Sequence, residues 1–359
     1  MPGIVTVTMA PAIDLTYRVG AVLPGAVNRA TAVTRELSGK GVNVSHAVAL
    51  AGERTRAVLP LGEHDSADLR APWLSPVPTA QRVRINVTMA TADGLTTKLN
   101  APTPTLTPDE LDAVLARAVD DSAELDADWL LIAGSVPRLS TGSEISIGEV
   151  IERLADRTTA RIAVDTSGSA LELVLTEALP RVALIKPNTH ELAEATGRSL
   201  TSLGDVREAA AALVARGCET VYVSMGEDGA LAVTADGSWW AHATPPGIVN
   251  TTGAGDASLA GFLVAGSPDR SESWRGPRSP ERAAAARAAG IPRSAHSGGA
   301  FEPGNPLPFD TAAAVTGAAR LGALSVSQAG TLLTELESAP PATLVVDPDP
   351  GIRLADPAE

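Results

Sequence analysis

An aspartate at the start of a glycine-rich helix has the clearest chemical meaning in this sequence. Asp256 closes the run N-T-T-G-A-G-D, and the apolar residues of an expected helix follow it directly. Gly253 and Gly255 let the backbone approach a ligand closely, and the first free N–H groups of a helix attract phosphate oxygens. Asp256 would then lie where it can take a proton from a hydroxyl that attacks the phosphate. The run therefore predicts proton transfer beside a bound anion.

Two other interpretations of this run are weaker. The letters from Gly253 to Ser258 also fit a degenerate dinucleotide fingerprint, G-x-G-x-x-S. That fingerprint belongs to an opening strand–turn–helix unit, whereas this run lies late in the chain and would place a carboxylate against a pyrophosphate. A glycine turn before an ordinary helix would explain the glycines, but it leaves the further motifs described below unexplained.

The composition limits the partners of the chain. The 359 residues carry a formal net charge of −14, which argues against nucleic acid or an anionic membrane, since either needs an extended basic surface. No apolar run reaches the length of a membrane span and no basic leader opens the chain, so we expect a cytoplasmic protein. The single cysteine, Cys218, excludes an internal disulfide, and no Cys/His cluster has zinc-ligand spacing.

The use of lysine is unusual. Arginine carries almost all of the positive charge, and the only lysines are Lys40, Lys98 and Lys186, each within a motif-like run. Lysine offers a compact, mobile ammonium that arginine does not. The pattern favours positions where such an ammonium is needed, although a few surface lysines would also survive this bias by chance.

The elements that would position these residues alternate between strands and helices. Short apolar, β-branched runs predict strands buried on both faces, at Ile4–Met9, Ala57–Leu61, Trp129–Ala133, Ile162–Val164, Val182–Ile185 and Val221–Ser224. Helical patterns lie between them, at Pro108–Val119, Ile145–Leu154, Leu171–Ala178 and Val206–Ala215. The alternation predicts an α/β fold with a doubly wound, mostly parallel sheet, whose ligands bind at the carboxyl ends of the strands.

Two segments, 16–37 and 81–100, are rich in strands without intervening helices. The apolar residues that alternate along the second and would share one face are Val83, Ile85, Val87 and Met89. This pattern predicts a half-exposed antiparallel sheet, with Asp93-Gly94 as a hairpin turn. Such strands would form a flap, or lid, over the substrate site. Their apolar face would pair with a second subunit and give a homodimer.

Six further motifs follow one another along the chain. They are A-P-A-I-D at 10–14, S-G-K-G-V-N at 38–43, V-R-I-N at 83–86 with T-K-L-N at 97–100, G-S-V-P at 134–137, K-P-N-T-H-E at 186–191 and S-M-G-E-D-G at 224–229. In this order they resemble the motifs of the ribokinase-like (PfkB) carbohydrate kinases. Within that family the chain is most similar to the phosphosugar branch of 1-phosphofructokinases and tagatose-6-phosphate kinases. The resemblance runs from about residue 4 to 262 and resumes at 313–331.

The resemblance implies a ribokinase-like fold and ATP-dependent phosphoryl transfer to a hydroxyl of a sugar phosphate. It implies that Asp256 is the general base and that the amides of Gly253, Ala254 and Gly255 stabilise the transferred group. The residues it implies for sugar-phosphate binding are Asp14, Gly39, Lys40, Asn43, Arg29, Arg84, Lys98, Ser135 and Arg138. Those it implies for nucleotide binding are Lys186, Asn188, Ser224, Gly226 and Gly229.

Asn188 and Glu191 are also expected to hold Mg²⁺. They lie three residues apart on an opening helical turn and could reach one hydrated cation together. In isolation, an N-cap residue with a capping-box glutamate explains the pair equally well.

The resemblance also implies a division of the chain. A kinase domain is expected over 1–338, with the flap from 16–37 and 81–100. A flexible insertion dense in Gly, Pro, Ser and Arg is expected at 266–310, with one short helix at 280–289, and a further helix follows at 311–324. The remaining 339–359 form a peripheral C-terminal tail with an edge strand at 343–346.

Two alternatives remain open. Ala10, Ser38 and Ala26 replace residues that are usual in the family, which leaves room for a catalytically inactive sugar- or nucleotide-binding regulator on the same fold. The intact Asp256 argues against it. A kinase for an unphosphorylated sugar or a nucleoside is the other alternative, and Asn250, where those branches more often have aspartate, argues against that one, as do Arg84 and Lys98.

Overall fold

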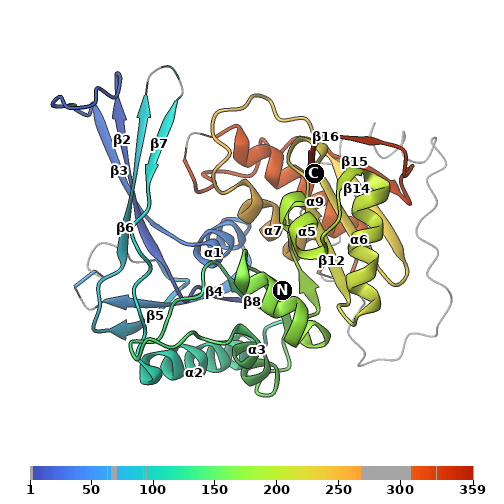
Figure 1. Ribbon diagram of the computed structural model, residues 1–359, viewed down its shortest axis with the longest axis horizontal. Coiled ribbons are helices and arrows are strands. Elements are labelled where there is room, and N and C mark those ends of the chain that lie inside the picture. Colours follow the sequence, from blue (N-terminus) through green and yellow to red (C-terminus); the bar gives the residue numbers. More distant parts are fainter. Residues whose placement is uncertain are drawn as a thin grey trace.

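The apolar runs of the sequence form the centre of one large sheet (Figure 1). The computed structural model describes residues 3–62, 64–65, 71–91, 93, 95–267, 309–328 and 330–358. In this part of the chain, the sheet has the strand order β15-β14-β13-β12-β10-β9-β8-β1-β4-β5. Its strands are β1 (Gly3–Val7), β4 (Arg54–Gly62), β5 (Leu74–Thr79), β8 (Trp129–Ala133), β9 (Arg161–Asp165), β10 (Leu184–Ile185), β12 (Thr220–Ser224), β13 (Ala230–Thr234), β14 (Gly237–His242) and β15 (Thr343–Val346). Every pair from β12 to β5 is parallel and the pairs from β12 to β15 are antiparallel, so the mostly parallel sheet is confirmed.

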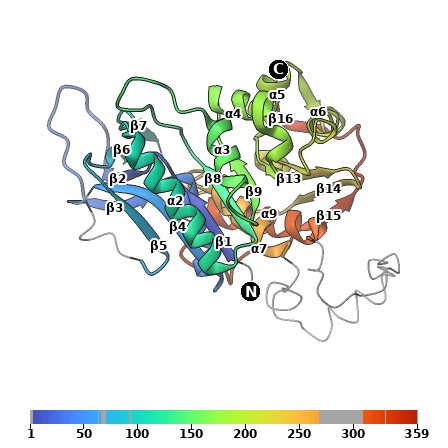
Figure 2. The same ribbon diagram turned by 90° about the horizontal axis from the view of Figure 1, so that it is seen from below.

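Helices cover both faces of this sheet (Figure 2). One core contains residues of α2 (Pro108–Leu125), α3 (Ile147–Ala155), α4 (Ser169–Leu173), α5 (Thr189–Thr196) and α6 (Leu203–Ala215). The other contains residues of α1 (Lys40–Leu50), α7 (Ala254–Ala265) and α9 (Thr311–Val326). Because side chains alternate along a strand, β8 sends Leu130 and Ile132 into the first core and Trp129 and Leu131 into the second. Burial on both faces explains why such strands are continuous apolar runs in the sequence.

The helices begin close to where the sequence predicts, and some end elsewhere. Thr107 caps α2 through a capping box with Glu110, but the helix continues past Val119 to the buried Leu125. The helix expected at 171–178 is divided into α4 and two short helical turns, 174–178 and 179–181. The second turn contains Pro180, which cannot continue an α-helix.

Helix α7, which carries the acidic glycine-rich run, packs very closely on α9. A Cβ added at Gly261 would lie 2.4 Å from the carbonyl oxygen of Gly317, so the two backbones touch at this point. The packing brings the end of α9 and the loop after it against the start of α7. The N–H groups of Val249 and Asn250 both donate to the carbonyl of Val326, at 2.7 and 3.2 Å.

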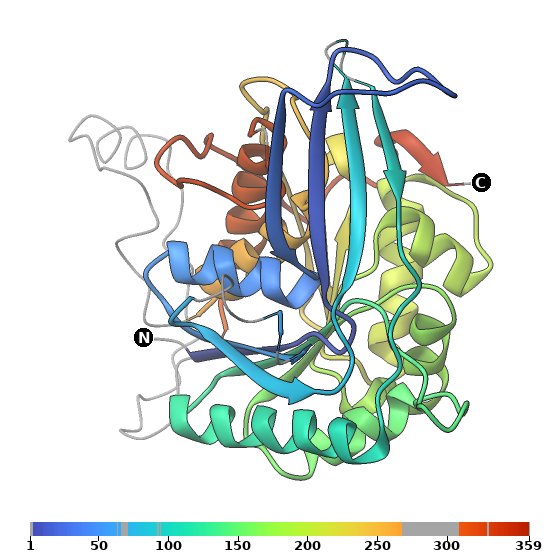
Figure 3. The same cartoon turned by 90° about the vertical axis from the view of Figure 1, so that its left-hand side faces the viewer.

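A second sheet forms the flap, which projects from the main body (Figures 1 and 3). Its strands lie in the order β3-β2-β6-β7, with β2 (Ala12–Val19), β3 (Ala32–Ser38), β6 (Arg84–Thr91) and β7 (Thr96–Leu99). The pairs β2–β3 and β6–β7 are antiparallel, as predicted, but β2 and β6 are parallel. Both strands leave the body in the same direction, after β1 and β5 respectively, so their pairing must be parallel. Gly94 of the expected hairpin turn lies outside the described residues.

The flap is anchored at its base. A small core there joins Ile13 and Leu37 of the flap to Val42 of α1 and Leu59 of β4. Other apolar side chains on the same face of the flap are more exposed, with Val33 at 52 %, Ile85 at 48 % and Leu99 at 69 %.

The structure describes the expected C-terminal tail but not most of the expected insertion. Residues 268–308, including the expected helix at 280–289, lie outside the described residues. The ends of this segment meet, because the N–H of Asp310 donates to the carbonyl of Gly266 at 2.9 Å. The tail contributes the edge strand β15, as predicted, and also β16 (Arg353–Ala358), which pairs with β11 (Leu200–Ser202) and is therefore less peripheral than expected.

No helix within the described ranges has the length and apolar character needed to cross a membrane.

Candidate active site

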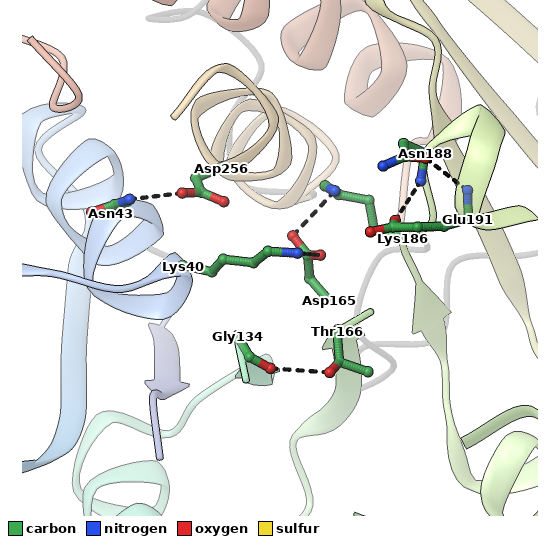
Figure 4. A network of polar contacts seen from close by, with 9 residues as sticks. All are labelled: Lys40, Asn43, Gly134, Asp165, Thr166, Lys186, Asn188, Glu191 and Asp256. Atoms are coloured by element: carbon green, nitrogen blue, oxygen red, sulfur yellow. Dashed lines mark hydrogen bonds and ion pairs between the residues drawn. The ribbon is translucent and has the colours of Figure 1, made fainter. Parts of the chain in front are cut away.

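The chemically suggestive aspartate lies between two helices at the carboxyl ends of the parallel strands. Asp256 is in the first turn of α7 and is 8 % exposed. Its Oδ2 accepts a hydrogen bond of 2.7 Å from Nδ2 of Asn43 in α1 (Figure 4). Oδ1 of Asn43 is buried and has no hydrogen-bond partner among the described residues. The arrangement leaves an acceptor on each of the two side chains for a bound hydroxyl group.

The turn before Asp256 requires glycine. Gly253 has a φ of 83°, and a Cβ at this position would lie 2.4 Å from the carbonyl oxygen of Thr331. The N–H groups of Gly253, Gly255 and Asp256 have no acceptor in the described part of the chain, whereas that of Ala254 donates weakly to Thr251, at 3.4 Å. The unpaired N–H groups form a site for an anion at the positive end of α7.

Two of the three lysines converge on one buried carboxylate. Asp165 ends β9 and is fully buried, with Nζ of Lys40 at 2.8 Å from Oδ1 and Nζ of Lys186 at 3.1 Å from Oδ2 (Figure 4). Lys40 opens α1, and Lys186 follows β10. A Cβ at Gly255 would lie 3.7 Å from Nζ of Lys186, so the ammonium of Lys186 is close to the glycine turn.

These charges change one another's ionisation. Burial, and after it the nearby Asp165, raise the pKa of Asp256 to about 6, against the opposing effects of Asn43 and the two lysines. Burial also disfavours the charged form of Asp165, but Lys186 and Lys40 outweigh it, so its pKa is below the usual value. Burial likewise opposes the charge of Lys186, but Asp165, then Asp256 and Glu191, hold its pKa above the usual value. At neutral pH, Asp256 is therefore an ionised carboxylate of raised basicity.

The start of α1 also lies beside the cluster of Asp165 and the two lysines. Gly39 precedes the helix with a φ of 144°, and a Cβ there would lie 2.6 Å from Cγ2 of Thr8. Gly134, at the end of β8, faces it, and its carbonyl accepts a hydrogen bond from Oγ1 of Thr166 at 3.0 Å. The next residue, Ser135, is exposed.

The polar face of the flap extends the site. Asp14 on β2 accepts a hydrogen bond of 3.0 Å from Nδ2 of Asn86 on β6. Arg84 lies on the same face, where its guanidinium donates to Oγ1 of Thr103 at 2.6 Å and to the carbonyl of Ala10 at 3.3 Å. Partial burial lowers the pKa of Arg84, while Asp14 opposes this. The N–H at Nε of Arg84 is buried without a partner in the described residues and is a free donor.

The remaining sugar-site candidates differ in position. Lys98, on β7, donates from Nζ to Oγ1 of Thr252 at 2.9 Å and so reaches the glycine turn. Arg29 lies in the exposed loop beyond the outer ends of β2 and β3 and has no polar contact with other described residues. Arg138 is paired with its own loop, at 3.4 Å from Glu144 and 2.8 Å from the carbonyl of Gly142. The structure brings Lys98 to Thr252, at the glycine turn before Asp256, and leaves the two arginines away from this turn.

The expected nucleotide residues lie beside Lys186. Asn188 caps α5, and it forms a reciprocal capping box with Glu191, with hydrogen bonds of 2.8 and 2.9 Å. The backbone of Asn188 bridges to Ser224 at the end of β12. Gly226 and Gly229 then form a turn, with φ values of 57° and 86°. A Cβ at Gly229 would lie 2.2 Å from the carbonyl of Ala241.

The capping role of Asn188 and Glu191 limits how they can hold a metal. Oδ1 of Asn188 and Oε2 of Glu191 already accept backbone N–H groups, so Oε1 of Glu191 is the carboxylate oxygen that remains without a hydrogen bond from the described residues. Among the residues that the structure describes, no group of three His, Cys, Asp or Glu side chains is arranged around a metal position. The donor set therefore fits a hard cation that takes most of its ligands from water and from a bound phosphate.

The run V-D-T-S-G at 164–168 also matches the phosphosugar branch, but only a role as pocket wall was expected for it, whereas Asp165 lies at the centre of this cluster. Two signals pointed to it. It ends a strand in the middle of a parallel sheet, where ligands bind, and the two rare lysines needed a counter-anion. Thr252 was also missed as the partner of Lys98.

Comparison with known proteins agrees with this geometry. Residues 4–271 match the model of the pfkB family of carbohydrate kinases. The chain is 36 % identical to 1-phosphofructokinase of Rhodobacter capsulatus over 272 residues, which cover 73 % of this chain and 83 % of the relative. It is 37 % identical to 1-phosphofructokinase of Haloferax volcanii over 270 residues, again covering 73 % and 83 %. The structure resembles phosphofructokinase-2 of Escherichia coli in complex with fructose-6-phosphate, with a TM-score of 0.63, 30 % identity and coverage of 74 % of this chain and 86 % of the other.

The pairing at Asp165 predicts a strong effect on stability. Asp165→Asn should lower the free energy of unfolding by about 3–5 kcal/mol, because it leaves two ammonium groups without their buried counter-anion. Chemical denaturation measures the loss. Asp112→Asn is the matched control, since Asp112 pairs with Arg153 at the surface, where side chains are 61 % and 42 % exposed, and should cost only about 0–1 kcal/mol. Equal, small losses in both variants would contradict the central role of Asp165.

Proposed function

The chain belongs to the pfkB family of carbohydrate kinases, and we propose that it transfers the γ-phosphoryl group of ATP to a hydroxyl of fructose 1-phosphate. The relatives named 1-phosphofructokinase support a sugar phosphate as the acceptor. One observation carries the chemistry. An ionised, buried carboxylate of raised pKa, Asp256, lies directly at a turn with unpaired N–H groups.

In this proposal Asp256 is the general base. It takes the proton from the attacking hydroxyl, and its pKa of about 6 makes it ionised and a stronger base than an ordinary carboxylate at neutral pH. Asn43 holds the carboxylate in place through its 2.7 Å hydrogen bond. The N–H groups of Gly253 and Gly255, with the helix start behind them, stabilise charge on the phosphoryl group as it is transferred.

The sugar phosphate would bind between the flap and the start of α1. Asp14 and the free Oδ1 of Asn43 can accept hydrogen bonds from sugar hydroxyls. Arg84 has the forked donors that suit the phosphate already on the sugar, and its unpaired Nε–H supports that role. Gly39, Lys40 and Ser135 would line the same space. Arg138 would have to leave Glu144 to take part, and Arg29 would need the flap tip to approach.

ATP would lie on the other side of the glycine turn. Lys186 and Asn188 are placed for its phosphates, and the turn of Ser224, Gly226 and Gly229 for the rest of the nucleotide. Glu191 would hold Mg²⁺ through its free Oε1, with Asn188 and water nearby. When bound, the cation neutralises phosphate charge.

The two alternatives are not favoured. The base, its Asn43 partner and the glycine turn are all in place, which argues against an inactive regulator. Arg84 on the flap argues for a phosphorylated acceptor over a free sugar or nucleoside.

We also propose a homodimer formed through the flap. Its exposed apolar side chains share the face opposite to Asp14 and Lys98, where a single sheet layer does not bury them.

Because the second substrate of the proposed reaction is ATP, we propose the cytoplasm as the location of the enzyme.

The choice of acceptor can be tested with a substrate panel. ADP release should be fastest with fructose 1-phosphate, slower with fructose 6-phosphate or tagatose 6-phosphate, and near background with fructose or adenosine. In Arg84→Ala, KM for the sugar phosphate should rise by at least about tenfold while KM for ATP changes little, because Arg84 would hold the phosphate that does not react. Rapid turnover of fructose or adenosine by the wild type would contradict the proposed substrate class.

The assignment of the base predicts a pH dependence. A carboxylate must be ionised to accept a proton, so kcat/KM of the wild type should fall as the pH drops through about 6. Asp256→Asn should lower kcat by at least about a hundredfold and remove this limb, while ATP still binds. Calorimetry with ATP provides the control. A variant that keeps most of its activity would show that another group takes the proton.

The proposed homodimer can be tested by sedimentation. The wild type should sediment as a dimer at micromolar concentration, whereas Ile85→Lys with Leu99→Lys should give monomers, because the charges oppose burial of this face. Leu344→Lys, at an exposed position on β15, is the matched control and should remain dimeric. A monomeric wild type would reject the proposal.

A further inference from the structure

Lys98 spans the gap between the flap and the catalytic turn. It pairs with Thr88 across β6–β7, and Thr88 pairs with Thr16 across β6–β2. Thr16 and Thr88 are each two residues from the paired Asp14 and Asn86, so all of them lie on one face of the sheet. Lys98 therefore projects from the polar face of the flap. Its Nζ donates to Oγ1 of Thr252, the residue directly before Gly253, at 2.9 Å. The ammonium of Lys98 therefore contacts the residue that leads into the glycine turn.

The charges around the turn explain why another cation is needed there. Lys40 and Lys186 share Asp165, and Asp256 adds a second carboxylate, so these two positive and two negative groups cancel. A phosphoryl group that arrives at Gly253 and Gly255 would bring negative charge that this buried cluster does not balance. Lys98 forms no ion pair with any carboxylate among the described residues, and its partner is a neutral hydroxyl.

The position of Lys98 differs from that of Arg84. Arg84 and Thr88, the partner of Lys98, are four residues apart along β6, a separation of about 13 Å in an extended strand. Arg84 is at the base of the flap, beside Asp14 and Thr103. The two cations are thus placed for two different phosphates rather than for one.

We infer that Lys98 is a catalytic residue, which moves from the hydroxyl of Thr252 to the oxygens of the phosphoryl group during its transfer. The inference rests on the proposed kinase function. The flap would then supply a cation to the transition state from outside the nucleotide site, and a charge-assisted contact of this kind strengthens as negative charge spreads over the transferred group. Transfer would be coupled to the approach of the flap, because Lys98 is fixed to it.

This role predicts a specific kinetic signature. Lys98→Met keeps the length of the side chain and removes its charge, so kcat should fall by at least about tenfold while KM for the sugar phosphate changes less than about threefold. Lys98→Arg should recover a large part of kcat, because it restores a cation. Arg18→Met removes an exposed cation from the same face of the flap, two residue pairs farther out, and should leave kcat unchanged.

A binding measurement separates this inference from the kinase assignment. ADP with aluminium fluoride and fructose 1-phosphate mimics the transferred phosphoryl group, and tryptophan fluorescence or calorimetry can follow it. Lys98→Met should bind this combination at least about tenfold more weakly than the wild type, but bind ADP alone equally well. If the wild type binds neither ADP nor the mimic, the kinase function fails. If the wild type binds both and Lys98→Met behaves the same, or loses only affinity for the sugar phosphate, the role of Lys98 in transfer is wrong.

Discussion

The site depends on one fully buried carboxylate that two lysines share. Asp165 holds Lys40, from the start of a helix on one face of the sheet, and Lys186, from the connection after the neighbouring strand. Buried charges persist only when they are paired, so the buried Lys186 requires Asp165, and Asp165 requires the two lysines, of which Lys40 is partly exposed. The triad thereby joins the half of the site that faces the flap to the half beside Asn188 and Ser224.

The same triad sets the chemistry of Asp256. The burial that disfavours its charge and the proximity of Asp165 raise its pKa, while the lysines limit the rise, so that the carboxylate is both basic and ionised at neutral pH. The cluster as a whole is close to neutral. It can therefore be buried, but it offers little net attraction to an incoming phosphate, and in the proposed mechanism this task falls to the N–H groups of the helix start and to Lys98.

Packing at a distance holds the glycine turn before Asp256 in position. The contact of Gly261 with Gly317 brings α9 against α7, and the loop after α9 then closes on Gly253, where the carbonyl of Thr331 leaves no room for a side chain. The flap is attached differently. Its base shares a small apolar core with α1 and β4, while its outer part has no such core among the described residues. The glycine turn is thus held by close backbone packing, whereas the flap is held only at its base. This difference is consistent with the proposal that the turn binds an anion and that the flap covers the sugar phosphate.

The sequence by itself determined the order and type of most elements, because periodicity, caps and glycine positions act over a few residues. It was enough to predict the parallel sheet, the flap, the capping of α2 and the acidic turn at Asp256. The tertiary structure alone decided which distant groups meet: Lys40 with Asp165, 125 residues apart, and Lys98 with Thr252, 154 residues apart. It also decided the parallel pairing of β2 with β6 and the docking of β16 on β11. No local pattern encodes such contacts, since they follow from how the whole sheet and its helices pack.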